Sequence, residues 1–118
     1  MRITIPISVG ELIDKITILQ IKSSYTDNEY VLKELEELNQ IKLTLTQDIL
    51  KYEVELKKVN EKLWNIEDKI REKEKLQEFD NEFVELARSV YITNDKRSRI
   101  KREINEICNS SYKEIKLY

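Results

Sequence analysis

The chain contains a single glycine, Gly10, and a single proline, Pro6, and neither residue type occurs again after position 10. Glycine and proline supply sharp turns and end helices, so this backbone has few places to bend. Charged residues make up 37% of the chain and hydrophobic residues 40%, a balance typical of long helices with charged outer faces. The sequence therefore predicts an all-α fold, an elongated helical hairpin or bundle in one domain over residues 1–118.

Apolar residues in the middle third of the chain recur at alternating intervals of four and three. This heptad spacing predicts a long helix with one apolar face, as in a seam between packed helices. An unbroken helix of about 45 residues would span roughly 65–70 Å. We therefore expect a bend or break within Thr44–Asp48, because threonine is a mediocre helix former and can cap. The seam consists of Leu45, Ile49, Tyr52, Leu56, Val59, Leu63, Ile66 and Ile70.

The first thirty residues carry signals for the start of two helices. Isoleucines alternate with other residues over Ile3–Ile7, which favours a short edge strand interrupted by proline. Ser8–Glu11 reads as a capping box, and apolar residues at helical spacing predict a first helix over Val9–Lys22. A second capping box, Thr26–Glu29, predicts the start of the next helix.

The last forty residues allow two interpretations. Asp80 can cap one helix and Thr93–Asp95 another, but the two segments can equally form one continuous helix. Asn109–Ser111 is expected to end the helical region. The remaining tail, Tyr112–Tyr118, looks extended, and a minor two-stranded ribbon with Ile3–Ile7 would join both ends of the chain.

Composition excludes several classes of function. The net charge is −2 with both signs interspersed, so no basic field favours nucleic acid, and we do not expect nucleic-acid binding. The chain has no histidine and one cysteine, Cys108, which excludes imidazole-based catalysis and a four-ligand zinc site. A metal would be Mg²⁺ or Mn²⁺ held by carboxylates. The sequence shows no membrane span or signal peptide, so we expect a cytoplasmic protein.

A first group of candidate ligand-binding residues lies on one predicted helix. Intervals of four, three and four place Asn60, Trp64, Glu67 and Arg71 on one face, with Asp68 beside them. The indole could stack on a base or a sugar while the acids bind a cation. The competing interpretation is that the indole anchors helix packing and the charges pair along the helix.

A second group of candidates follows along the chain. A helix that began near Thr93 would offer free N–H groups with basic residues close by, which suits an anion such as phosphate. The alternative is a simple cap on a solvated basic face. The group consists of Arg88, Tyr91, Asn94, Asp95, Arg97 and Lys101.

A third pair, Glu11 and Asp14, could share a divalent cation because the two carboxylates are three residues apart. The capping box already explains Glu11, however. We therefore assign no metal ligand and no catalytic residue from the sequence.

Three stretches resemble a bacterial and phage family of unknown function that is often encoded among glycosyltransferase and cell-surface polysaccharide genes. They are Ile5–Leu19, Val59–Glu74 and Phe83–Asn105, and Asp27–Lys51 is the least similar part. The resemblance implies a setting in cell-surface glycan synthesis. It marks the candidates from Trp64 to Lys101 as part of the family pattern without assigning them chemistry.

Two functional hypotheses follow. The seam favours a helical interaction or assembly module, because an apolar ridge left in water is unfavourable, and we expect a homodimer or another protein partner. The alternative is binding, or Mg²⁺-dependent hydrolysis, of a phosphorylated small molecule such as a nucleotide or nucleotide sugar. We favour a protein that is not an enzyme and has no cofactor.

Overall fold

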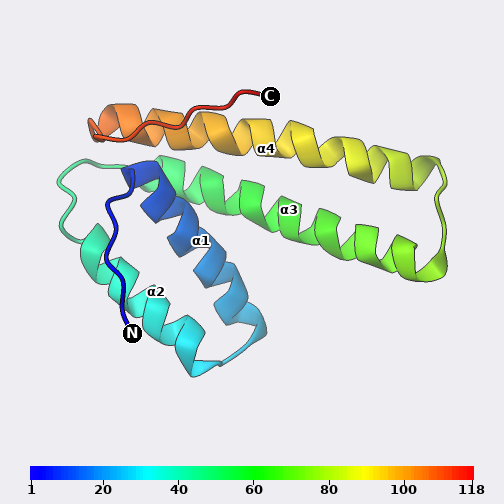
Figure 1. Ribbon diagram of the computed structural model, residues 1–118, viewed down its shortest axis with the longest axis horizontal. Coiled ribbons are helices and arrows are strands. Elements are labelled where there is room, and N and C mark those ends of the chain that lie inside the picture. Colours follow the sequence, from blue (N-terminus) through cyan, green and yellow to red (C-terminus); the bar gives the residue numbers. More distant parts are fainter.

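Four helices and no strands make up the structure, a computed structural model that describes residues 1–118 (Figure 1). The predicted all-α class is confirmed, and the shape is elongated, with extents of 47 × 34 × 27 Å. The radius of gyration is 16.1 Å, against about 13.5 Å for a compact domain of this length. The helices are α1 (Val9–Tyr25), α2 (Glu29–Lys42), α3 (Leu50–Leu76) and α4 (Asn81–Ile107).

The expected break within Thr44–Asp48 is confirmed. Helix α2 ends at Lys42 and α3 begins at Leu50, and the Thr44 hydroxyl donates to the Ile41 carbonyl in the intervening turn. The second turn follows α3, where Gln77 adopts a left-handed conformation with φ 54°. Together with the connection between α1 and α2 at residues 26–28, these turns fold the chain into a long α3–α4 hairpin and a shorter α1–α2 hairpin that packs against one end of it (Figure 1).

Two predicted helix boundaries are wrong, and the two interpretations of the last forty residues are resolved. Helix α1 continues to Tyr25, because the Ser23 and Ser24 hydroxyls donate to carbonyls within the helix, 2.7 and 2.6 Å away. The cap of α2 is Asn28 rather than Thr26. Helix α4 runs unbroken through Thr93–Asp95, so no helix begins there.

The predicted ribbon between the chain ends is also wrong. Both ends are extended but lie on different helices: the N-terminal segment follows α2 and the C-terminal tail runs back along α4 (Figure 1). Arg2 reaches Glu37 of α2 at 3.7 Å, whereas Lys116 of the tail reaches Asp95 of α4 at 3.4 Å. The first residues of α1 are fixed against the end of α4, which directs the two ends apart.

The predicted seam forms the core. Its buried members pack against α1 and against the second half of α4, so the chain covers its own heptad face. The seam by itself therefore does not require a second copy. The core cluster consists of Leu12, Ile13, Ile16, Ile49, Leu56, Val59, Ile100 and Ile104.

Gly10 fixes the close approach of α1 to α4. Its amide donates to the side-chain oxygen of Asn105 at 2.7 Å, and the neighbouring Val9 amide donates to Ser110 at 3.1 Å. A Cβ atom at Gly10 would lie only 2.6 Å from the carbonyl oxygen of Lys101. The only glycine of the chain thus lies where the backbones of two helices touch.

The α3–α4 hairpin is covered at one end only. Helix α1 lies against the half that contains the core, and α2 packs mainly on α1 and reaches α3 through the ion pair of Lys42 with Glu53 at 2.9 Å. Beyond Asn60, α3 has one buried residue, Ile66, and α4 has none before Thr93. No helix is both long and apolar enough to cross a membrane.

Candidate functional site

A carboxylate lies buried at the junction of three helices. Asp14 of α1 is 1% exposed and receives hydrogen bonds from Asn60 of α3, at 3.0 Å, and from Nε of Arg97 on α4, at 2.9 Å. Nη2 of Arg97 donates to its second oxygen, which makes the pair bidentate. The Asn60 amide also donates to Thr17 at 2.9 Å. These bonds tie α1, α3 and α4 together by polar contacts.

Asp14 and Arg97 are both held in their charged forms. Burial alone would raise the pKa of Asp14, but hydrogen bonds from Arg97 and Asn60 and nearby positive charges outweigh burial and lower this pKa. The hydrogen bonds to Asp14 in turn raise the pKa of Arg97. A buried charge is tolerated only when it is paired in this way.

Next to this pair, side chains of α1, α3 and α4 surround a cavity of about 310 Å³, here named the cleft. Trp64 forms part of its wall, and the ring of Tyr25 stacks on the indole with centroids 5.1 Å apart and planes 13° apart. This stacking fixes the orientation of the indole. The cleft is lined by Ile18, Ile21, Asn60, Leu63, Trp64, Glu67, Val90, Asn94 and Arg97.

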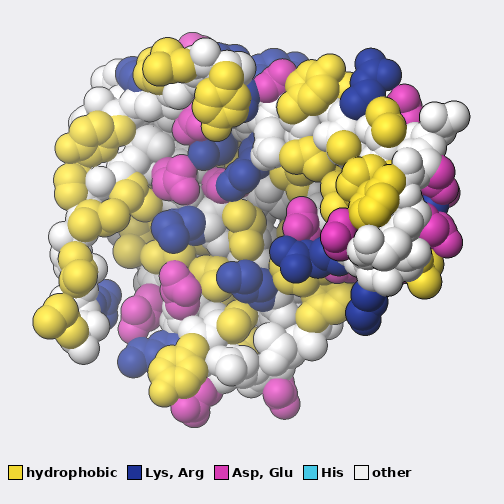
Figure 2. Space-filling model, turned by 45° about the vertical axis from the view of Figure 1, so that its right-hand side comes forward, with side chains coloured by type: hydrophobic (Ala, Val, Ile, Leu, Met, Phe, Trp, Pro, Cys, Tyr) yellow, Lys and Arg dark blue, Asp and Glu magenta, His cyan; other side chains and the backbone are white.

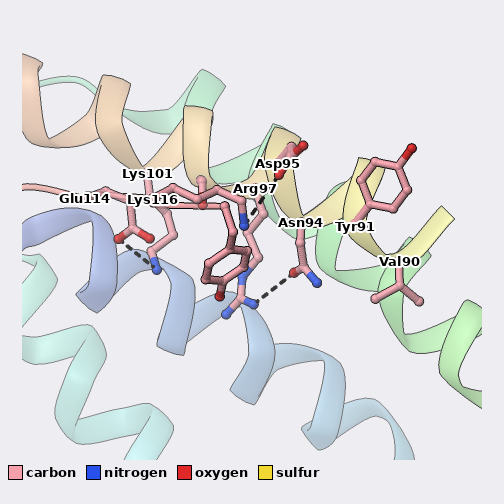
Figure 3. Close-up of a pocket in the computed structure, with 10 residues that line it drawn as sticks. Val90, Tyr91, Asn94, Asp95, Arg97, Lys101, Glu114 and Lys116 are labelled. Atoms are coloured by element: carbon pink, nitrogen blue, oxygen red, sulfur yellow. Dashed lines mark hydrogen bonds and ion pairs between the residues drawn. The ribbon is translucent and has the colours of Figure 1, made fainter. Parts of the chain in front are cut away.

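A second cavity, of about 610 Å³, lies between α4 and the C-terminal tail (Figure 3). Ion pairs join the tail to α4: Lys101 with Glu114 at 3.2 Å and Asp95 with Lys116 at 3.4 Å. Lys101 also contacts Glu11 of α1 at 2.9 Å. Charged side chains of the tail therefore already pair with the charged side chains of α4 that face them.

The structure brings together seven of the ten candidate residues and leaves three apart. The cleft contains Trp64, Glu67, Asn94 and Arg97, so both sequence groups contribute to it. The cavity beside the tail contains Tyr91, Asn94, Asp95, Arg97 and Lys101. Neither cavity is lined by Asp68, Arg71 or Arg88.

The phosphate site that a helix start near Thr93 would have provided does not form, because α4 is continuous there. The basic candidates are also paired with acids: Arg71 with Glu67 at 3.1 Å and Arg88 with Glu85 at 3.3 Å. No three carboxylate or thiol groups lie close enough together to hold a metal ion. Glu11 and Asp14 bind different cationic partners on α4 rather than a shared cation.

Sequence reasoning missed the role of Asp14 as an anchor. A signal was present, since a carboxylate within the apolar face of the first helix must find a buried partner. The partner could not be named, because Arg97 is 83 residues away. Thr93, one of the possible caps, lies inside α4, where its residue is 3% exposed and its hydroxyl has no hydrogen-bond partner.

Comparison with known proteins supports the resemblance seen in the sequence. The model of a family of unknown function, DUF6165, matches residues 1–118. The chain belongs to this family. The match includes all four helices and the residues of both cavities. Neither the curated proteins nor the solved structures gave a match to the chain.

Proposed function

We propose that this chain is a helical interaction module that forms an antiparallel homodimer through the outer face of α4. The observation that carries this function is the uncovered half of the α3–α4 hairpin, which no third helix shields. Helices gain most of their stability from packing an apolar face, so a projecting two-helix arm is suited to receive a partner. The expected setting in cell-surface glycan synthesis is part of this proposal.

Large apolar side chains lie exposed along the uncovered part of α4. Val84 is 50% exposed, Tyr91 57% and Ile92 53%. Two more, Leu76 and Phe79, are 59% and 54% exposed at the tip of the hairpin. Figure 2, which brings this end of the molecule forward, shows hydrophobic side chains grouped among charged ones. Exposed apolar residues in contiguous groups mark interaction surfaces.

The charges on α4 favour a second copy as the occupant. Glu85 and Arg99 lie seven residues on either side of Ile92, and Glu82 and Arg102 lie ten residues on either side. All five side chains are exposed. When two copies of α4 cross antiparallel at Ile92, Glu82 and Glu85 of one copy face Arg102 and Arg99 of the other, while Arg88 and Lys96, four residues on either side of Ile92, face each other with like charge. A parallel arrangement would place like charges together at all of these positions.

Two-fold symmetry would form each of these opposite-charge pairs twice. In an isologous contact, Glu85 of each copy faces Arg99 of the other, so the same pair forms twice. The Glu85 side chain is 70% exposed and pairs with Arg88 of the same helix at 3.3 Å, and the Arg99 side chain is 51% exposed and pairs with Glu55 of α3 at 3.5 Å. Each must therefore exchange an exposed ion pair for one with the second copy. An unrelated partner would need to reproduce this reversed charge pattern, whereas a second copy supplies it by symmetry.

Charge reversal provides a sharp test. Glu85→Arg alone and Arg99→Glu alone each place two like-charged pairs across the homodimer, and we expect each to raise the dissociation constant by about tenfold. A mixture of the two variants restores both opposite-charge pairs in the heterodimer. Sedimentation equilibrium measures each species and the mixture, and Glu36→Arg on α2 is the control for the same charge change elsewhere.

The expected result is that the single variants dissociate, that their mixture associates as tightly as the original chain, and that Glu36→Arg has no effect. A chain that stays monomeric at high concentration would contradict the proposed assembly. So would a mixture that associates no better than its two components, because the contact would then not be centred on Ile92.

A further inference from the structure

The cleft lies on the inner side of α4, away from the face proposed for dimerisation, so the two surfaces can be tested separately. Its lining has an apolar part and a polar part. Ile18 and Ile21 of α1 contribute apolar side chains, while Asn60, Asn94 and Arg97 contribute polar groups from the other two helices. A concave site with an apolar wall and a few convergent polar groups is the usual form of a small-molecule site.

The internal hydrogen bonds determine which polar atoms remain for a ligand. Both N–H groups of the Asn60 amide are used on Asp14 and Thr17, which leaves its carbonyl oxygen as an acceptor. The oxygen of Asn94 receives a long contact of 3.5 Å from Nη1 of Arg97, which leaves its amide N–H groups as donors. Nη1 of Arg97 retains donor capacity because Nε and Nη2 serve Asp14.

The charges of the cleft disfavour an anionic ligand. Arg97 is neutralised by the buried carboxylate of Asp14, and Glu67 adds a carboxylate that is paired with Arg71 at the exposed rim. These groups sum to no net positive charge. A phosphate group offers acceptors alone, so it would use Arg97 and the Asn94 amide but would be repelled by Glu67. A phosphorylated ligand therefore fits the cleft poorly.

We propose that the cleft binds one neutral sugar ring. A hydroxyl group both donates and accepts, so vicinal hydroxyls match the mixed set formed by the Asn60 oxygen, the Glu67 carboxylate, the Asn94 amide and Arg97. The apolar C–H face of a pyranose suits the wall formed by Trp64 and its apolar neighbours. A volume of about 310 Å³ lies at the lower end of ligand pockets and is large enough for one ring.

The chain carries its own reporter for this site, because Trp64 is the only tryptophan. In a ¹⁵N-labelled full-length protein, the single indole N–H signal reports on the wall of the cleft. The probes are glucose, galactose, mannose and N-acetylglucosamine, with inorganic phosphate and glucose 1-phosphate as anionic comparisons. We expect a saturable shift of the indole signal with at least one neutral sugar at millimolar concentration and no saturable shift with phosphate.

Two asparagine variants localise the response. Asn94→Ala removes a donor inside the cleft, and we expect about fivefold weaker sugar binding. Asn65→Ala removes the same group beside Trp64 on the side of Tyr25, outside the cleft, and leaves binding unchanged. Circular dichroism verifies that both variants fold. Absence of a saturable shift with all four sugars, a stronger response to phosphate, or a loss confined to Asn65→Ala each overturns the proposed site.

Discussion

Replacing Gly10 by alanine tests whether backbone contact between α1 and α4 organises the fold. The added Cβ would lie 2.6 Å from the carbonyl oxygen of Lys101 and 2.9 Å from the side-chain oxygen of Asn105. The first of these atoms belongs to the backbone of α4 and cannot rotate away. The two helices must therefore move apart, or α1 must shift along α4.

The magnitude follows from three opposing contributions. Alanine is favoured over glycine inside a helix by about 1 kcal/mol, which stabilises the variant. Forcing a methyl group into a closed contact costs about 2 kcal/mol. Weakening the 2.7 Å hydrogen bond between the Gly10 amide and Asn105 costs about 1 kcal/mol more. The sum is a net destabilisation of about 2 kcal/mol, or a fall in melting temperature of roughly 10 °C.

Urea unfolding followed by circular dichroism measures this change. The protein concentration must be the same for all variants, because self-association would add to the apparent stability. Lys15→Ala, at an exposed position of the same helix, is the control and should change the free energy of unfolding by less than about 0.5 kcal/mol. An unchanged or increased stability of Gly10→Ala would refute the close contact and leave helix propensity as the dominant effect.

Three further outcomes are expected. The pKa of Asp14 is lower in the folded chain than in the unfolded chain. Its pairing therefore contributes stability above about pH 4, and this stability is lost as the pH falls through the folded-state pKa. Asp14→Asn should reduce this loss at low pH in urea midpoints measured against pH. Leu56, which is fully buried, should lose about 2–5 kcal/mol of unfolding free energy on change to alanine, measured by urea unfolding. Tyr91→Ser should weaken self-association in sedimentation equilibrium, whereas Tyr30→Ser, at a still more exposed position on α2, should not; equal effects would argue against the α4 contact.

The helices were predictable because local signals suffice for them. The heptad spacing located α3, and Ser8 and Asp80 accept hydrogen bonds from the amides of Glu11 and Phe83, as their capping patterns predict. The sequence left the continuity of α4 open, because Thr93 resembles a helix cap. Thr93 lies on the buried face of α4, one turn before Arg97, and helix packing there determines its environment.

The candidate site was predictable only in part. Intervals along each helix placed Trp64 with Glu67, and Asn94 with Arg97, but no local pattern states that the two pairs face a common cavity. That arrangement depends on the register of the hairpin and on Asp14, which fixes Arg97 from a third helix. Long-range pairing of this kind is set by tertiary packing, whereas the patterns in the sequence report on single helices.

Helix α2 contains no buried residue, packs on α1 and joins α3 through the Lys42–Glu53 ion pair. Opening it would remove no fully buried side chain of its own, so its free energy of local unfolding should be below that of the whole chain. In amide hydrogen exchange, α2 should lose protection first while the core-facing turns of α3 and α4 still exchange slowly. The chain would then unfold in stages instead of as one cooperative unit. A melting curve that follows total helix content would report the sum of the two unfolding events.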